Sequence, residues 1–183
     1  MGVLKKECSS IAGDLTQPGI RFVVDGSTWN VRPERLSVES TDPDLDCGKL
    51  IAKVLSKLRW TPVMAIGSNF TFTTNAARDS GIPVDFKLPS SKKHKFSSRV
   101  SQVTVPHDDR EVVIQLTAEE TGFTLLLNNH TDIQAKRLDG KQLVRSRRAR
   151  SACELFFEHR EQSVQLAKSI LGGQFIYVND DIV

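Results

Sequence analysis

Residues 20–58 read IRFVVDGSTWNVRPERLSVESTDPDLDCGKLIAKVLSKL, and this stretch decides the fold class. Asp25-Gly26 separates two β-prone runs, and such a pair is a strong hairpin signal because both turn positions need a positive φ. From Leu50 to Leu58 the apolar residues recur at helical spacing, with lysines on the opposite side. Antiparallel strands followed by an amphipathic helix predict an α+β fold.

The start of this helix carries the signals expected of a helix N-terminus. Asp42-Pro43-Asp44 supplies capping candidates, and Asp44 and Asp46 place negative charge where the helix dipole favours it. Before the helix, Pro33 interrupts the ladder and residues 36–40 alternate again as a strand. The helix ends before Pro62, because the residue that precedes a proline is pushed out of the α region.

Downstream of the helix, residues 63–74 alternate as a strand, with Phe70 and Phe72 on the face that also takes Ile66. Gly67 in this strand suggests a bulge or a close backbone approach. Three further runs, at 100–105, 111–117 and 123–127, are separated by turns and predict an antiparallel meander. A helix is expected from about Arg147 to Leu171, and residues 175–177 suggest an added edge strand.

The order of elements predicts one domain over residues 1–183, built as two β-plus-helix halves. The halves cover residues 11–75 and 97–178, and a seam at residues 76–96 joins them. We therefore expect an antiparallel sheet, or two such sheets, covered by two long amphipathic helices whose apolar stripes are buried against it.

Composition narrows the class of protein. A chain of 183 residues that is 39% hydrophobic and 26% charged is typical of a globular domain. It contains no apolar run near the roughly 20 residues of a membrane span, and no secretory signal, so a cytoplasmic protein without membrane contact is expected. Cys8, Cys47 and Cys153 are too far apart to indicate a disulfide framework or a zinc knuckle, and no metal or cofactor is predicted.

Charge is spread unevenly along the chain. Residues 81–150 hold 13 cationic and 8 anionic side chains, a net +5, whereas residues 151–183 hold 2 and 5, a net −3. Two basic segments, 92–99 and 136–150, account for much of this excess. Closely spaced cations can hold phosphates, although a solvated loop and a salt-bridged helix start are the simpler interpretations. The candidate phosphate or nucleic-acid contacts are Lys92, Lys93, Lys95, Arg99, Arg145, Arg147, Arg148 and Arg150.

No motif names a reaction. A serine-nucleophile elbow, a phosphate loop and a dinucleotide fingerprint are all missing from the sequence. The leading hypothesis is a non-enzymatic binding or assembly module that works through a sheet edge or a helix face, with a protein partner or a second copy of itself. One alternative is a nucleic-acid-binding protein that uses the two basic segments. The other is an enzyme with a pocket between helix and sheet, so whether the protein is an enzyme stays open and no catalytic residue is assigned.

Overall fold

The hairpin at Asp25-Gly26 opens the sheet as expected. In the computed structural model both residues have positive φ, 49° and 75°, which suits a tight two-residue turn. The strands on either side are β2 (Ile20–Val24) and β3 (Ser27–Arg32), and β4 (Arg35–Ser40) follows. An outer strand, β1 (Cys8–Gly13), pairs with β2.

The structure describes residues 8–13, 19–58, 61–74, 98–107, 110–119, 122–133, 142–171 and 175–182. The predicted seam at 76–96 therefore lies outside the described residues.

Helix α1 (Cys47–Lys57) confirms the amphipathic helix, but its cap differs from the expectation. Asp46 is the capping residue, and its carboxylate accepts a hydrogen bond from the backbone N–H of Lys49 at 2.9 Å. Asp42 is used in a local turn, where its carboxylate accepts from the N–H of Asp44.

The middle of the sheet consists of long strands that match the predicted pattern. They are β5 (Ala65–Thr74) and the meander β6 (Ser98–Pro106), β7 (Glu111–Glu119) and β8 (Phe123–Asp132). Ile66, Phe70 and Phe72 are buried on one face, as expected. The bulge predicted at Gly67 is wrong, because Gly67 pairs with His130 in regular register. A register shift does lie on the other side of β5, where Thr71 pairs with Asn179 and Phe72 with Tyr177, so that Val178 of β9 is the extra residue.

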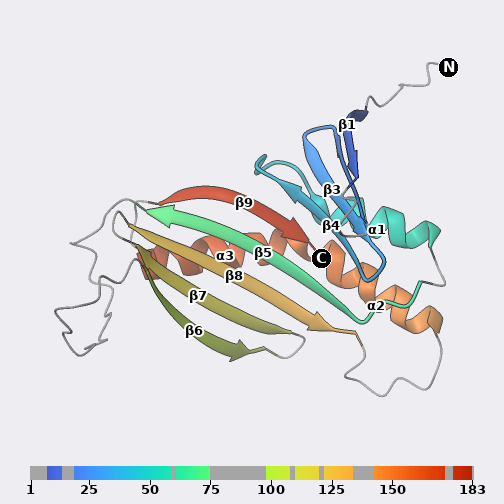
Figure 1. The fold of residues 1–183 in the computed structure, drawn as a ribbon. Helices are drawn as coiled ribbons and strands as arrows, with labels where there is room; N and C mark the ends of the chain where they lie inside the picture. The colour runs from blue at the N-terminus through green and yellow to red at the C-terminus, as the bar shows by residue number, and fades with distance from the viewer. Residues whose placement is uncertain are drawn as a thin grey trace.

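The last strand, β9 (Ile176–Ile182), corrects two predictions. It was expected at an edge, but the strand order β1-β2-β3-β4-β9-β5-β8-β7-β6 places it inside one nine-stranded antiparallel sheet. Val38 of β4 and Ser68 of β5 both pair with Ile182. The sheet is therefore not divided into two β-plus-helix halves, since the C-terminal strand joins β4 to β5 (Figure 1).

The long helix predicted at 147–171 is two helices, α2 (Gln142–Glu154) and α3 (Phe156–Leu171), with an interruption at Leu155. The structure thus has three helices in its described residues where two were expected. Gly48 of α1 lies at this junction. A Cβ added there would lie 2.1 Å from the carbonyl oxygen of Cys153 and 2.4 Å from Cβ of Phe156. Only glycine allows α1 to approach so closely.

The core lies between the helices and one face of the sheet (Figure 1). Phe70, Leu125 and Leu127 of the sheet are fully buried there together with Phe156 of α3. The rings of Phe70 and Phe156 pack with centroids 5.2 Å apart. Within the described residues no helix is both long and apolar enough to cross a membrane. The face with the helices is called the helix face below, and the opposite one the open face.

Candidate functional site

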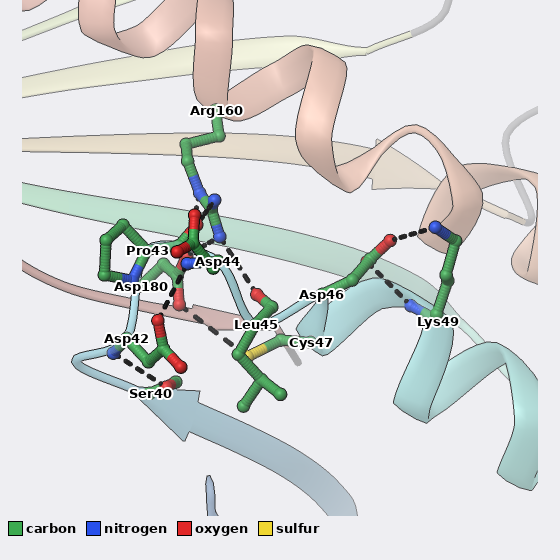
Figure 2. Close-up of polar contacts among 10 residues, drawn as sticks. All are labelled: Ser40, Asp42, Pro43, Asp44, Leu45, Asp46, Cys47, Lys49, Arg160 and Asp180. Atoms are coloured by element: carbon green, nitrogen blue, oxygen red, sulfur yellow. Dashed lines mark hydrogen bonds and ion pairs between the residues drawn. The ribbon is translucent and has the colours of Figure 1, made fainter. Parts of the chain in front are cut away.

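Helix α3 holds the sheet through a buried ion pair on its β9 side (Figure 2). Nε of Arg160 donates to Oδ2 of Asp180 at 3.0 Å, and its NH2 group donates to the same oxygen at 2.7 Å. The two side chains are 10% and 0% exposed. A charged pair this far from water survives because the guanidinium has further hydrogen-bond acceptors.

Those further acceptors belong to the loop that precedes α1. Arg160 donates to the backbone carbonyls of Pro43 and Leu45, the latter at 3.0 Å (Figure 2). Its guanidinium also lies over the ring of Phe157, 4.5 Å from the centroid. One side chain therefore ties together α3, β9 and the 42–46 loop, and we interpret it as a structural centre.

The reactive groups around this pair are held in their protonated forms. Burial, together with the negative charge of Asp180, raises the pKa of the Cys47 thiol far above its ordinary range, and it does the same for the Tyr177 phenol. Burial also raises the pKa of Asp180, and Arg160 opposes that shift. Since the thiolate is the nucleophilic form of cysteine, Cys47 is poorly suited to nucleophilic catalysis.

The other flank of α3 is open. Between α3 and strands β6–β8 lies a groove of about 310 Å³. Its walls are mostly apolar, with a few polar groups at one end. The described lining residues are Val105, His107, Arg110, Val112, Ile114, Asn129, Gln162, Ser163 and Leu166. Volume and lining fall within the range usual for small-molecule sites, at the lower limit in size.

Arg110 is fixed at one end of this groove by neutral amides. Its Nε donates to Oδ1 of Asn129 at 3.1 Å, and its NH2 group donates to Oε1 of Gln162. Asn129 is itself anchored, because its Nδ2 donates to Oγ of Ser163 at 3.3 Å. An amide donor cannot act as a general base for that serine, so the arrangement suits binding better than nucleophilic catalysis.

The outermost strand next to the groove, β6, forms an exposed sheet edge. Among the described strands its one partner is β7, and the pairing is regular from Ser98 to Pro106. Residues 100–106 carry no charge. Val103 is 59% exposed and Val105 37% exposed on the helix face, and Val100 is 58% exposed on the open face. Natural edge strands usually carry charges, prolines or irregularities that discourage pairing; residues 100–105 have none of these, and Pro106 is the last residue of the strand.

The basic residues predicted to contact nucleic acid are only partly within the described structure. Lys92, Lys93 and Lys95 lie outside the described residues, and so do residues 136 and 137. Of Arg99 and Arg145 only the backbone is described, in β6 and α2. Arg147 is exposed on α2, whereas Arg148 and Arg150 are half-buried there.

Arg99 and Arg148 lie at opposite ends of β8. Arg99 pairs with Ala118, which pairs with Phe123 at the start of β8. Arg148 donates to the carbonyl of Ile133, just beyond the end of β8, at 3.5 Å. At about 3.3 Å per residue, these ends are roughly 30 Å apart.

Two further polar features belong to the sheet. A hollow of about 180 Å³ on the open face is lined by Asn30, Arg32, Arg35 and Ser37. Near it, the amide of Asn69 donates to Asp181, and the amide of Asn179 donates to Glu39 at 3.0 Å. Within the described part of the chain, no three histidine, cysteine or acidic side chains are grouped so as to hold a metal ion.

The sequence analysis did not identify Arg110 or Arg160, the two arginines that connect α3 to the sheet. Arg110 was interpreted as part of a turn, and its neighbours on β8 and α3 are remote in sequence. Arg160 did leave a signal, because it falls on the buried stripe of α3 with Phe156 and Ser163. A cation on a buried stripe requires a buried partner, and the only acidic pair in the final apolar strand is Asp180-Asp181.

Comparisons with known proteins do not add a relative to this description. No protein-family model, curated protein or solved structure matches the chain. The groove, the β6 edge and the hollow on the open face are therefore the features of the described structure that bear on function.

Proposed function

We propose that this protein is a non-enzymatic assembly module that pairs with a second copy of itself along β6. One observation carries the proposal: residues 100–106 of the outermost strand are uncharged, and valines are exposed on both of its faces. A long edge of this kind offers a row of backbone donors and acceptors to another strand. The other edge strand, β1, is less suitable, because its six residues include a register shift between Cys8 and Ser10.

The chemistry of β6 favours a second copy as the partner. A twofold axis through Gln102 would pair all nine residues of β6 antiparallel with the same nine of the other copy. In this register Arg99 of one copy faces Val105 of the other, so the two arginines do not meet. The valines of both copies would then form continuous apolar rows across the junction.

The test places a charge on the proposed twofold axis. Gln102→Lys would put two lysines directly opposite each other, and like charges at such positions destabilise strand pairing. We expect the wild type to sediment as a dimer and the variant to dimerise at least roughly tenfold more weakly. Sedimentation velocity over a wide range of protein concentration measures both.

Gln115→Lys is the matched control, because Gln115 pairs with Gln102 from β7 on the same face, one strand inside the edge. It should dimerise like the wild type. Mixing Gln102→Lys with Gln102→Glu should restore a dimer that neither variant forms alone. A wild type that remains monomeric at high concentration, or a dimer that is insensitive to Gln102→Lys, would rule out pairing of β6 with itself.

A further inference from the structure

The hairpin that joins β3 to β4 places two arginines directly opposite each other. Arg32 ends β3 and Arg35 begins β4, and the two are partners in the strand register. Side chains at opposite positions of an antiparallel pair lie on the same face, with Cβ atoms about 5 Å apart. Like charges in this position destabilise the pairing of the strands. Glu34 of the turn forms no ion pair with either arginine among the described contacts.

The next pair along the same face adds two neutral groups. Asn30 is opposite Ser37, and these two lie two residues inward from Arg32 and Arg35. Because side chains alternate between the faces of a strand, all four belong to the open face. Together they line the hollow of about 180 Å³, and each of the four can donate hydrogen bonds into it.

The charge of the hollow is positive. None of the described ion pairs or side-chain hydrogen bonds includes Arg32 or Arg35, and both side chains are exposed. Two carboxyls, Glu39 and Asp181, follow on the same face beyond Ser37. Arg35 acts on Asp181 at a distance, where it opposes the rise in pKa that burial causes. Neither carboxyl lines the hollow, so an anion that entered it would be attracted.

The donor set matches a phosphate group. Two guanidinium forks, a hydroxyl and an amide approach from two strands, which suits an anion whose oxygens point in several directions. A carboxylate has two oxygens in one plane and a single charge, whereas a phosphate monoester has three terminal oxygens and a charge of about −1.5 to −2. That charge balances two arginines. The volume equals roughly six water molecules, which is enough for one tetrahedral oxyanion and little more.

We infer that the hollow between Arg32 and Arg35 binds a phosphate group as its dianion. The two arginines hold its oxygens from the rim, and the buried Ser37 donates to it from the base together with Asn30. The bound charge removes the repulsion between the arginines and stabilises the hairpin. This site goes beyond the proposed dimer and does not depend on it, because β9, β5, β8 and β7 separate β4 from β6.

The probes are inorganic phosphate and methyl phosphate, with dimethyl phosphate and acetate as singly charged anions. The ¹⁵N-labelled protein is titrated in a phosphate-free buffer at about pH 7.5, where a monoester is mostly a dianion. Amide chemical shifts should show saturable one-to-one binding of phosphate or methyl phosphate, with the largest shifts in β3 and β4. We expect the singly charged anions to bind at least about tenfold more weakly. Binding of phosphate alone identifies the free ion as the ligand, and methyl phosphate that binds at least as tightly identifies a phosphate group on a larger molecule.

Variants assign the binding to the hollow. Arg32→Gln and Arg35→Gln should each weaken phosphate at least about tenfold, because each removes a charged fork. Arg32→Lys keeps the charge without the fork and must also bind phosphate more weakly than the wild type. Arg21→Gln is the matched control, because Arg21 is exposed on the same face, opposite Asn30 on β2, and does not line the hollow. It should weaken phosphate less than about twofold at physiological ionic strength.

The inference is overturned if neither phosphate nor methyl phosphate binds, or if dimethyl phosphate or acetate binds as tightly as they do. It is also overturned if Arg21→Gln weakens binding as much as Arg32→Gln, since that would show a general attraction of anions to this face. Thermal unfolding gives a second readout: saturating phosphate should raise the midpoint of the wild type and leave that of Arg32→Gln unchanged.

Repeating the titration in Gln102→Lys separates the two proposals. Phosphate should bind this variant as it binds the wild type, because the hollow and the β6 edge lie in different parts of the sheet. A wild-type dimer without phosphate binding refutes the hollow alone. A monomeric wild type that binds phosphate at the hollow refutes the dimer alone.

Discussion

An arginine connects each flank of α3 to the sheet, and the surroundings of the two arginines differ. On the β9 side, Arg160 meets a carboxylate and two carbonyls in a closed interior. On the β8 side, Arg110 meets two neutral amides at the end of an open groove. One flank of α3 is therefore closed, and the other borders a groove that has room for a ligand.

The difference shows how to separate an arginine that holds a fold from one that is suited to a ligand. Both are oriented by hydrogen bonds, so orientation alone does not distinguish them. What distinguishes them is the space beside the guanidinium. Arg160 has a buried countercharge from Asp180, and none of the described cavities lies beside it, whereas Arg110 lines a groove of about 310 Å³ whose walls are mostly apolar.

The largest effect should come from breaking the closed flank. Asp180→Asn removes the countercharge of Arg160 and leaves a buried guanidinium, which should lower the free energy of unfolding by about 3–5 kcal/mol. Urea unfolding followed by circular dichroism measures the change. Replacing both partners, Arg160→Met with Asp180→Leu, should recover much of that loss. A cost below about 1 kcal/mol for Asp180→Asn would show that the pair is not the structural centre described above.

The next effect tests how tightly the closed flank is packed. Gly48→Ala would place a methyl group 2.1 Å from the Cys153 carbonyl oxygen, and α1 would have to move. We expect a loss of about 1–3 kcal/mol in unfolding free energy, because overpacking against backbone relaxes poorly. Gly67→Ala is the control, since its added Cβ would meet nothing closer than Asn128 at 3.8 Å. Equal losses for the two variants would contradict the close approach of α1.

A smaller effect is expected on the open flank. Arg110→Gln loses hydrogen bonds to Asn129 and Gln162 at the end of an open groove and not in a closed interior. Its cost should be about 1 kcal/mol, well below that of Asp180→Asn. The same urea experiment compares them directly. If the two costs were equal, Arg110 would be a structural residue, and the contrast between the flanks would fail.

The smallest effect concerns Asp181, which alternates with Asp180 on β9 and faces the open side of the sheet. Burial raises its pKa above the ordinary value of 3.8. Asn69 and Arg35 oppose that shift, and Glu39 and Asp180 add to it. Between the unfolded and the folded pKa the native state binds more protons, so this carboxyl lowers stability as pH rises through that window.

Comparison with Asp181→Asn isolates this contribution. The difference in unfolding free energy, wild type minus variant, should fall as pH rises above about 3.8 and then become constant. Glu39→Gln, which leaves Asp181 in place, should reduce this fall, because Glu39 adds to the raised pKa of Asp181. A difference that rises with pH over this range would mean that the Asp181 pKa is lowered in the native state.

Local elements of the fold could be predicted from the sequence, and the long-range pairings could not. Asp25-Gly26 predicts a turn and the alternation around Phe70 predicts a strand, because turn geometry and side-chain period depend on only a few neighbouring residues. The central position of β9 depends on Val38 meeting Ile182, which no local pattern encodes. The interruption at Leu155 also escaped, since no glycine or proline marks it in the sequence; in the structure the residues on either side of it lie against Gly48 of α1.

For the candidate site, too, local features could be predicted from the sequence and long-range contacts could not. The sequence predicted antiparallel strands, and hence exposed sheet edges, but it did not say which strand lies at an edge. A pocket between helix and sheet entered only through the enzyme alternative, which named no residues and stays a prediction. Arg110, Asn129 and Ser163 come from a turn, a strand and a helix, so their meeting requires the tertiary fold. The two basic segments were noticeable in the sequence because the cations within each one are close together. Closeness within a segment does not bring Arg99 of one segment near Arg148 of the other.

The insertion of β9 between β4 and β5 has a consequence for how the chain is made. Strands β1–β4 and β5–β8 can each pair while the ribosome is still translating, but neither group can join the other until residues 176–182 have emerged. Contacts between residues so distant in sequence slow folding. During this interval the nascent chain would expose the edges of β4 and β5, which become interior only when the final strand arrives.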